Sequence, residues 1–94
     1  MLRITSHDNN GTICLKLEGS LKGVWVSEME QCWRKAASDR NKALIVDLTD
    51  VDFVDKAGRY LLALIHVHGG GFIAVTPLMS ELVAEISSGS DLPH

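Results

Sequence analysis

The sequence predicts a single α/β domain, in which a mixed β-sheet carries helices on one face in the order ββαβαβα. The chain has 94 residues, too few for two domains that fold independently. Alternating apolar and polar residues around a turn sequence near the start indicate an antiparallel hairpin. Short apolar runs then alternate with helical patterns, which is typical of parallel strands joined by right-handed crossovers.

The hairpin is expected over residues 2–18. Residues 2–7 and 13–18 both alternate apolar with polar side chains, as strands with one face on a core do. Asn10 and Gly11 adopt a positive φ at low cost, so they supply the turn between the two strands.

A loop at residues 19–23, with glycine at both ends, leads to the first helix. Ser27 and Glu30 fit a capping box, although the periodicity indicates a start one turn earlier. The apolar face of this helix consists of Trp25, Met29, Cys32, Trp33, Ala36 and Ala37.

The next strand is expected at residues 44–48, an apolar run with β-branched residues that is typical of a strand buried on both faces. Residues 49–54 alternate polar with apolar side chains and are expected to form a connector. Asp55 then caps a second helix by accepting hydrogen bonds from backbone N–H groups of the first turn.

The second helix is expected at about 56–68 and is mostly apolar. The spacing of Lys56, Arg59, Ala63 and His66 predicts one narrow stripe that faces water. The glycines at 69–71 end this helix with a left-handed cap.

A short strand at 72–75 and a third helix complete the pattern. Thr76 caps this helix, and Pro77 fits its first turn. The domain is thus expected to span residues 1–94, with a core at about 2–88 and a frayed tail at 89–94.

Composition excludes several classes of protein. The formal net charge is −3, whereas nucleic-acid binders normally carry a basic surplus. No apolar run approaches the length that spans a bilayer, and the first residues lack the apolar region of a signal peptide. Two cysteines are too few for a disulfide scaffold, which favours a reducing cytoplasm.

The sequence offers no motif for catalysis, a metal or a cofactor. No Ser-His-Asp or Cys-His pairing has a motif context, so an enzyme is not expected. His66 and His68 point in different directions on a helix and cannot share an ion. The glycines at 69–71 follow a helix, the reverse of a phosphate-binding loop. The acids between 47 and 55 lack the pattern of a calcium loop.

One segment is unusual for its position. Asp55-Lys56-Ala57-Gly58 opens a helix, where acids are favoured, yet Lys56 stands in the first turn and Arg59 follows it. These cations are either tolerated at a small cost in stability or form a basic spot that a partner binds.

Five stretches of the sequence share their order and intervals with a known family: residues 17–21, 43–48, 51–58, 61–62 and 70–75. With these stretches the chain resembles a STAS domain, the fold of anti-sigma factor antagonists and of the cytoplasmic tails of sulfate transporters. The resemblance covers about residues 11–88, and it implies a non-catalytic regulatory module of a bacterial cytoplasm that binds an anti-sigma factor or serine kinase-like protein.

The chain departs from the antagonists at two places. Where the antagonists carry a serine that the partner kinase phosphorylates, this chain has Lys56, which has no hydroxyl group. In the loop at 19–22 the antagonists commonly carry two acids, and this chain has Lys22 instead. The resemblance therefore implies a module without the serine switch, whose basic patch of Lys22, Lys56 and Arg59 faces an acidic or phosphate-bearing partner.

Two alternatives remain open from the sequence. Compact STAS subunits of bacterial lipid-trafficking ABC transporters also lack the serine, stop early and dock on an ATPase subunit. The basic patch would also suit a nucleotide or another anionic ligand. In each case the expected contact residues are Ser20, Leu21, Lys22, Asp55, Lys56, Ala57, Gly58 and Arg59.

Overall fold

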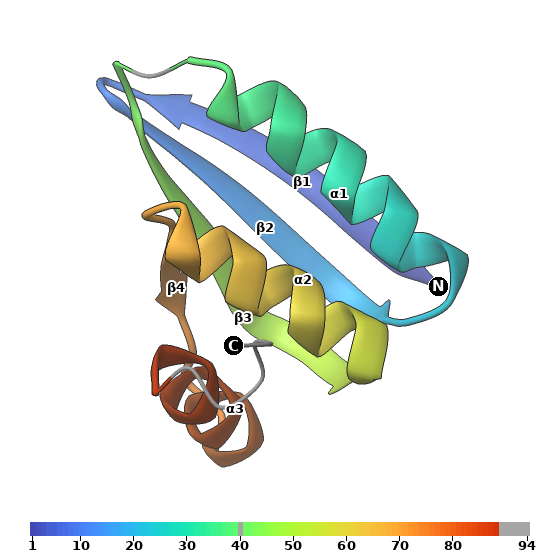
Figure 1. Cartoon of the computed structure of the whole chain (residues 1–94). Coiled ribbons are helices and arrows are strands. Elements are labelled where there is room, and N and C mark those ends of the chain that lie inside the picture. Colours follow the sequence, from blue (N-terminus) through green and yellow to red (C-terminus); the bar gives the residue numbers. More distant parts are fainter. Residues whose placement is uncertain (40, 89–94) are drawn as a thin grey trace.

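The elements follow one another in the predicted order ββαβαβα. The structure is a computed structural model and describes residues 1–39 and 41–88, so the predicted fraying of residues 89–94 lies outside it. Figure 1 shows α1 and α2 side by side on one face of the sheet, with α3 beyond β4. The sheet has the strand order β1-β2-β3-β4. Its strands are β1 (Leu2–Asn9), β2 (Thr12–Leu21), β3 (Ala43–Val54) and β4 (Gly71–Ile73), and the helices are α1 (Val24–Ala37), α2 (Lys56–Val67) and α3 (Pro77–Ser87).

The hairpin forms as predicted. β1 pairs with β2 in antiparallel register from Leu2 opposite Gly19 to Asn9 opposite Thr12. The turn residues Asn10 and Gly11 have φ values of 38° and 93°, and these two residue types adopt a positive φ at low cost. The remaining pairs, β2 with β3 and β3 with β4, are parallel, so the sheet is mixed as expected.

The expected connector at residues 49–54 is wrong, because these residues belong to β3. Parallel pairing with β2 continues up to Leu21 opposite Val54, with two register shifts along the way. Leu48 and Val51 are both buried although they are three residues apart. Strict alternation would place them on opposite faces, so the irregular pairing is what turns both side chains toward the core.

Helix α1 begins at Val24, one turn before the capping box that Ser27 and Glu30 suggest. Gly23 occupies the N-cap with φ 57°, and no side chain caps this helix. Glu30 instead pairs with Arg34 one turn further along, at 2.8 Å. The earlier start that the periodicity indicates is therefore confirmed, and the capping box is wrong.

Helices α2 and α3 begin as predicted. Asp55 accepts a hydrogen bond from the Gly58 N–H group, and Thr76 accepts one from Met79 N–H. The predicted exposed stripe on α2 is wrong, however, because Ala63 is fully buried and Arg59 forms an ion pair with Glu85 of α3. Helix α3 packs against α2 beside Arg59, and Lys56 alone of the four stripe residues is exposed.

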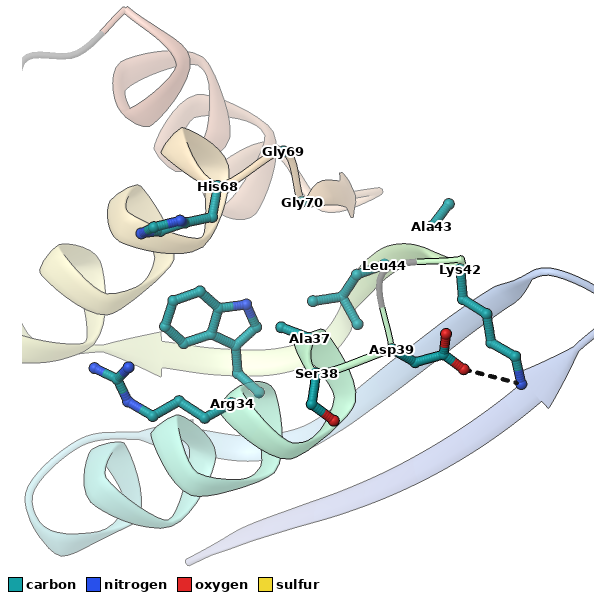
Figure 2. Close-up of a pocket in the computed structure, with 11 residues that line it drawn as sticks. Arg34, Ala37, Ser38, Asp39, Lys42, Ala43, Leu44, His68, Gly69 and Gly70 are labelled. Atoms are coloured by element: carbon teal, nitrogen blue, oxygen red, sulfur yellow. Dashed lines mark ion pairs between the residues drawn. The ribbon is translucent and has the colours of Figure 1, made fainter.

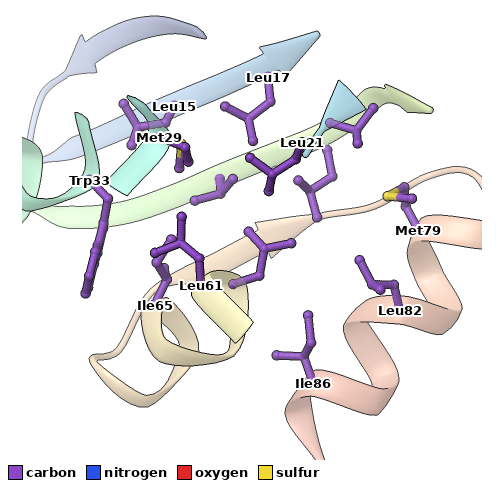
Figure 3. Close-up of a cluster of buried hydrophobic side chains, with 14 of the residues drawn as sticks. Leu15, Leu17, Leu21, Met29, Trp33, Leu61, Ile65, Met79, Leu82 and Ile86 are labelled. Carbon is purple, nitrogen blue, oxygen red and sulfur yellow. The ribbon is translucent and has the colours of Figure 1, made fainter. Parts of the chain in front are cut away.

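One apolar core holds the elements together. It extends from Leu2 of β1 to Ile86 of α3, and Figure 3 shows its side chains filling the space between the sheet and the helices. Every fully buried large side chain among the described residues is apolar. None of the helices in residues 1–39 and 41–88 is long and apolar enough to cross a membrane.

Candidate partner-binding site

The carboxyl ends of β2 and β3 lie side by side, and both helices that follow them start at this end of the sheet (Figure 1). We call this end the apex. It comprises Ser20, Lys22, Gly23, Asp52, Phe53, Asp55 and Lys56.

Asp55 joins the two halves of the apex. One carboxylate oxygen accepts from Gly58 N–H at 2.7 Å and so caps α2. The other accepts from Gly23 N–H at 3.0 Å, across 32 positions of sequence. The Asp55 N–H group itself donates to the Leu21 carbonyl at 3.1 Å. Asp55 therefore fixes the loop between β2 and α1 to the start of α2, through both its carboxylate and its backbone N–H group.

The same contacts control the charge of Asp55. Hydrogen bonds from Gly23 N–H and then Gly58 N–H lower the pKa of its carboxyl group, and the nearby Lys22 ammonium lowers it further. The side chain is consequently ionised at neutral pH, and its charge faces the positive end of the α2 dipole.

Close approach of the backbone requires glycine at two positions here. A Cβ atom on Gly19 would lie 2.3 Å from the Met1 carbonyl oxygen, and Gly19 has φ 111°. A Cβ atom on Gly58 would lie 2.7 Å from the Leu21 carbonyl oxygen. Either contact is shorter than atoms tolerate, so these glycines allow β1, β2 and α2 to meet.

Side chains on the surface of the apex are also ordered. Ser20 Oγ donates to an Asp52 carboxylate oxygen at 2.7 Å. The Lys22 ammonium lies 5.9 Å from the centre of the Phe53 ring, within the range of a cation–π contact. These contacts hold a hydroxyl group, a cation and an aromatic ring in defined places at the apex.

The residues predicted to contact a partner come together at the apex, but they differ in exposure. Lys22, Lys56 and Ala57 are exposed, and Ser20 and Asp55 are half-buried. Leu21 and Gly58 are buried, so they position the site and do not offer surface. The expected exposure of Arg59 is wrong, because this half-buried residue pairs with Glu85.

The prediction from sequence missed an apolar surface next to the apex. The side chains of Val24, Phe53 and Tyr60 are 75%, 49% and 47% exposed. Along the outer side of α2 we define the α2 stripe as Ala57, Tyr60, Leu64 and Val67; Leu64 is half-buried and the others are exposed. Their spacing of i, i+3, i+7 and i+10 is a helical pattern that was present in the sequence.

Metal-ligating side chains do not cluster in the described part of the chain, where no group of three could hold an ion. His66 stacks on Phe72 with ring centres 6.5 Å apart. His68 lies against Trp33, with 5.5 Å between the ring centres. The two imidazoles thus pack on different neighbours.

Solved structures share this arrangement of strands and helices. An anti-sigma factor antagonist from Mycobacterium paratuberculosis matches 99% of this chain and 84% of its own, with a TM-score of 0.82 and 21% sequence identity. This chain has the STAS fold. The fold expected from the matching segments is therefore confirmed.

Two further solved structures match this chain with lower similarity. The anti-sigma factor antagonist SpoIIAA in its unphosphorylated form has a TM-score of 0.68 at 18% identity, over 88% of this chain and 83% of its own. The protein Mglu matches 78% of this chain and 19% of its own, with a TM-score of 0.61 and 17% identity. No family model and no curated protein matches the sequence.

Proposed function

We propose that this chain is a non-catalytic regulatory module of a bacterial cytoplasm that binds a protein partner through the apex and the adjoining α2 stripe. One observation carries the proposal: two exposed cations, Lys22 and Lys56, belong to the apex, where the mostly exposed α2 stripe begins at Ala57. Apolar anchors bordered by charges are the usual composition of a protein interface.

The charges of this surface select its partner. Lys22 and Lys56 are exposed cations on a chain whose formal net charge is −3. Complementary charge accelerates association and disfavours wrong partners more than it adds affinity. The partner therefore carries carboxylates opposite the two lysines and apolar side chains opposite Tyr60 and Val67.

Lys56 gives this module a permanent charge at the start of α2. In antagonists of the resembling family, this position carries the serine whose phosphorylation releases the partner. A phosphoserine adds a charge of about −2, whereas a lysine side chain has no hydroxyl group that a kinase could phosphorylate. Binding at this apex is accordingly controlled by the availability of the partner and not by phosphorylation of residue 56.

Direct binding measurements test the proposal. The purified chain is titrated against each anti-sigma factor, each serine kinase of that type and each ABC transporter ATPase encoded in the same genome. One of these classes is expected to bind with micromolar or tighter affinity. The class that binds also distinguishes the antagonist-like module from the transporter subunit.

Three variants connect that binding to the surface. Lys22→Glu and Lys56→Glu are each expected to weaken it by about tenfold or more, because like charges then face each other. Tyr60→Ala removes an apolar anchor and has a similar effect. The matched control is Lys35→Glu, an exposed cation in the last turn of α1, outside the apex. Equal binding by all four variants would refute the proposal.

A further inference from the structure

The sheet has two outer edges, one at β1 and one at β4. In the strand order β1-β2-β3-β4, neither outer edge pairs with another strand among residues 1–39 and 41–88. β4 pairs with β3 only from Gly71 opposite Ile45 to Ile73 opposite Asp47. In Figure 1, β4 lies at the margin of the sheet and α3 lies past its carboxyl end. Unpaired strand edges are templates on which another chain can add a strand.

The edge at β1 carries charges. Arg3 and Asp8 are both exposed on this strand. Asp8 forms an ion pair with Lys42, and the Lys42 ammonium also lies 3.9 Å from the carboxylate of Asp39 (Figure 2). Charged side chains on an edge strand disfavour pairing with a second chain, because an approaching strand must strip water from them. The β1 edge is therefore a poor template.

The edge at β4 has no such protection. None of residues 69–80 is charged, and the segment begins with three glycines. Figure 2 shows Gly69 and Gly70 leading from the end of α2 into β4, and neither residue has a side chain that could cover the start of the strand. An incoming strand therefore meets no charge and little steric obstruction along this segment.

Apolar side chains of the same segment are exposed. Phe72 and Ala74 pack against the core, whereas Ile73 and Val75, which alternate with them, are 41% and 68% exposed. Leu78, in the first turn of α3, is 59% exposed. We define the β4 strip as Ile73, Val75 and Leu78. Removing such side chains from water is the main favourable term in protein association.

An uncharged edge suits pairing with a second copy of itself. Around a two-fold axis, each side chain of a strand lies near the same or a neighbouring side chain of the other copy, so a charged edge brings like charges together. The β4 edge instead brings Ile73 and Val75 of one copy against the same side chains of the other, and β-branched pairs of this kind stabilise a sheet. Asp47 lies one strand further in, where its carboxylate accepts from Thr49 N–H at 2.9 Å.

Two other ways of covering the edge fit less well. Pairing of β4 with β1 of another copy would repeat without closing, and the charges of β1 oppose it. A different protein would find no pattern of charge on this segment by which to recognise it.

From this uncharged edge and its exposed strip, we propose that two copies of the chain associate through β4, antiparallel around a two-fold axis. Their two sheets then form one continuous sheet, with the β4 strips of both copies in contact. The β4 strip shares no residue with the apex or the α2 stripe, so this association does not depend on the proposed partner surface.

Sedimentation equilibrium tests the proposal. A reducing agent is included, because the free thiols Cys14 and Cys32 could otherwise link copies covalently. The paired segment is short, so we expect a monomer–dimer equilibrium with a Kd of about 10–100 μM. Amide NMR shifts on raising the concentration should concentrate at residues 71–75. A chain still monomeric at about 1 mM, assembly beyond a dimer, or shifts concentrated at residues 2–9 would overturn the proposal.

Variants connect the dimer to the β4 strip. Val75→Lys and Leu78→Lys each add a charge at an exposed position outside the paired residues of β4, and circular dichroism checks that they fold. Each is expected to raise the Kd at least about tenfold, because the added charges lose water and repel each other across the axis. Val67→Lys is the matched control, since Val67 is 58% exposed on the α2 stripe, and it should leave the Kd unchanged. A dimer that survives both β4 variants, or that Val67→Lys abolishes, would also overturn the proposal.

Discussion

Asp55 has the largest structural role of any single side chain at the apex. It accepts from Gly58 N–H and Gly23 N–H, which belong to segments that follow different strands. Replacing it with alanine removes a helix cap and a bond across the loop together. We expect Asp55→Ala to lower the free energy of unfolding by about 2 kcal/mol, measured by urea denaturation at neutral pH.

The pH dependence of this loss follows from the lowered pKa of Asp55. A carboxyl group whose pKa is lower in the folded state stabilises that state above its unfolded pKa, and the contribution is lost as the pH falls through the folded pKa. The difference between wild type and Asp55→Ala should thus be constant near neutrality and shrink below about pH 4. Asp50→Ala, which breaks an exposed ion pair with Lys16, should cost less than about 1 kcal/mol. A difference between Asp55→Ala and wild type that persists unchanged at pH 2 would contradict this explanation.

At Gly58, helix propensity and packing have opposite effects on the stability of an alanine variant. Within a helix, alanine is normally more stable than glycine by about 1 kcal/mol. Here the added Cβ atom would meet the Leu21 carbonyl at 2.7 Å and the Val54 side chain at 2.8 Å. Gly58→Ala should therefore destabilise the fold by about 1–3 kcal/mol in the same denaturation experiment. Ala57→Gly, one position earlier and exposed, should cost only the propensity term, and a stabilised Gly58→Ala protein would show that α2 can move away from β2.

At the scale of elements, β3 shows what the sequence can and cannot predict. Its first half is a continuous apolar run and was predicted. Its second half alternates polar with apolar residues, a pattern that an exposed connector shares with a half-buried strand. Only pairing with the end of β2, which is distant in sequence, decides between them, and the register shifts there have no local signal.

For helix α2 and the candidate site as well, the sequence predicted local features but not contacts between distant segments. Its cap, its start and its terminating glycines are local features, and each was predicted from neighbouring residues. Its exposed side depends on where α3 packs, which is set by the tertiary structure. The sequence therefore placed the exposed stripe on the wrong side of the helix, at Lys56, Arg59, Ala63 and His66. For the same reason the hydrogen bond from Gly23 N–H to Asp55 had no local signal, although Asp55 and Lys22, the residue before Gly23, were among the predicted contact residues.

The contact between α2 and α3 can be measured through Arg59 and Glu85. Their side chains are 34% and 45% exposed, so solvent screens the pair only in part. A double-mutant cycle with Arg59→Met and Glu85→Gln should give a coupling energy of about 1 kcal/mol that decreases with added salt. The control cycle on Arg34 and Glu30, more exposed and within one helix, should give about 0.5 kcal/mol or less. A coupling between Arg59 and Glu85 no larger than this control would mean that apolar packing alone positions α3.

For the molecule as a whole, the continuity of the core implies one unit of folding. Buried side chains of the sheet and all three helices belong to one cluster. Both tryptophans lie on α1, so fluorescence reports this helix, whereas far-ultraviolet circular dichroism reports every element. Cys14 and Cys32 are free thiols, so no covalent link between elements contributes to this cooperativity.

If the core unfolds as one unit, a substitution that destabilises α3 must also lower the urea midpoint reported by α1. Ile86 is fully buried in α3, the last element, and Ile86→Val removes a single methylene group there. We expect a loss of about 1 kcal/mol that lowers the urea midpoint equally in fluorescence and in circular dichroism. The wild-type curves should coincide for both probes, with and without a reducing agent. Separate midpoints, or a shift seen by circular dichroism alone, would mean that α3 unfolds independently and that the chain is not a single cooperative domain.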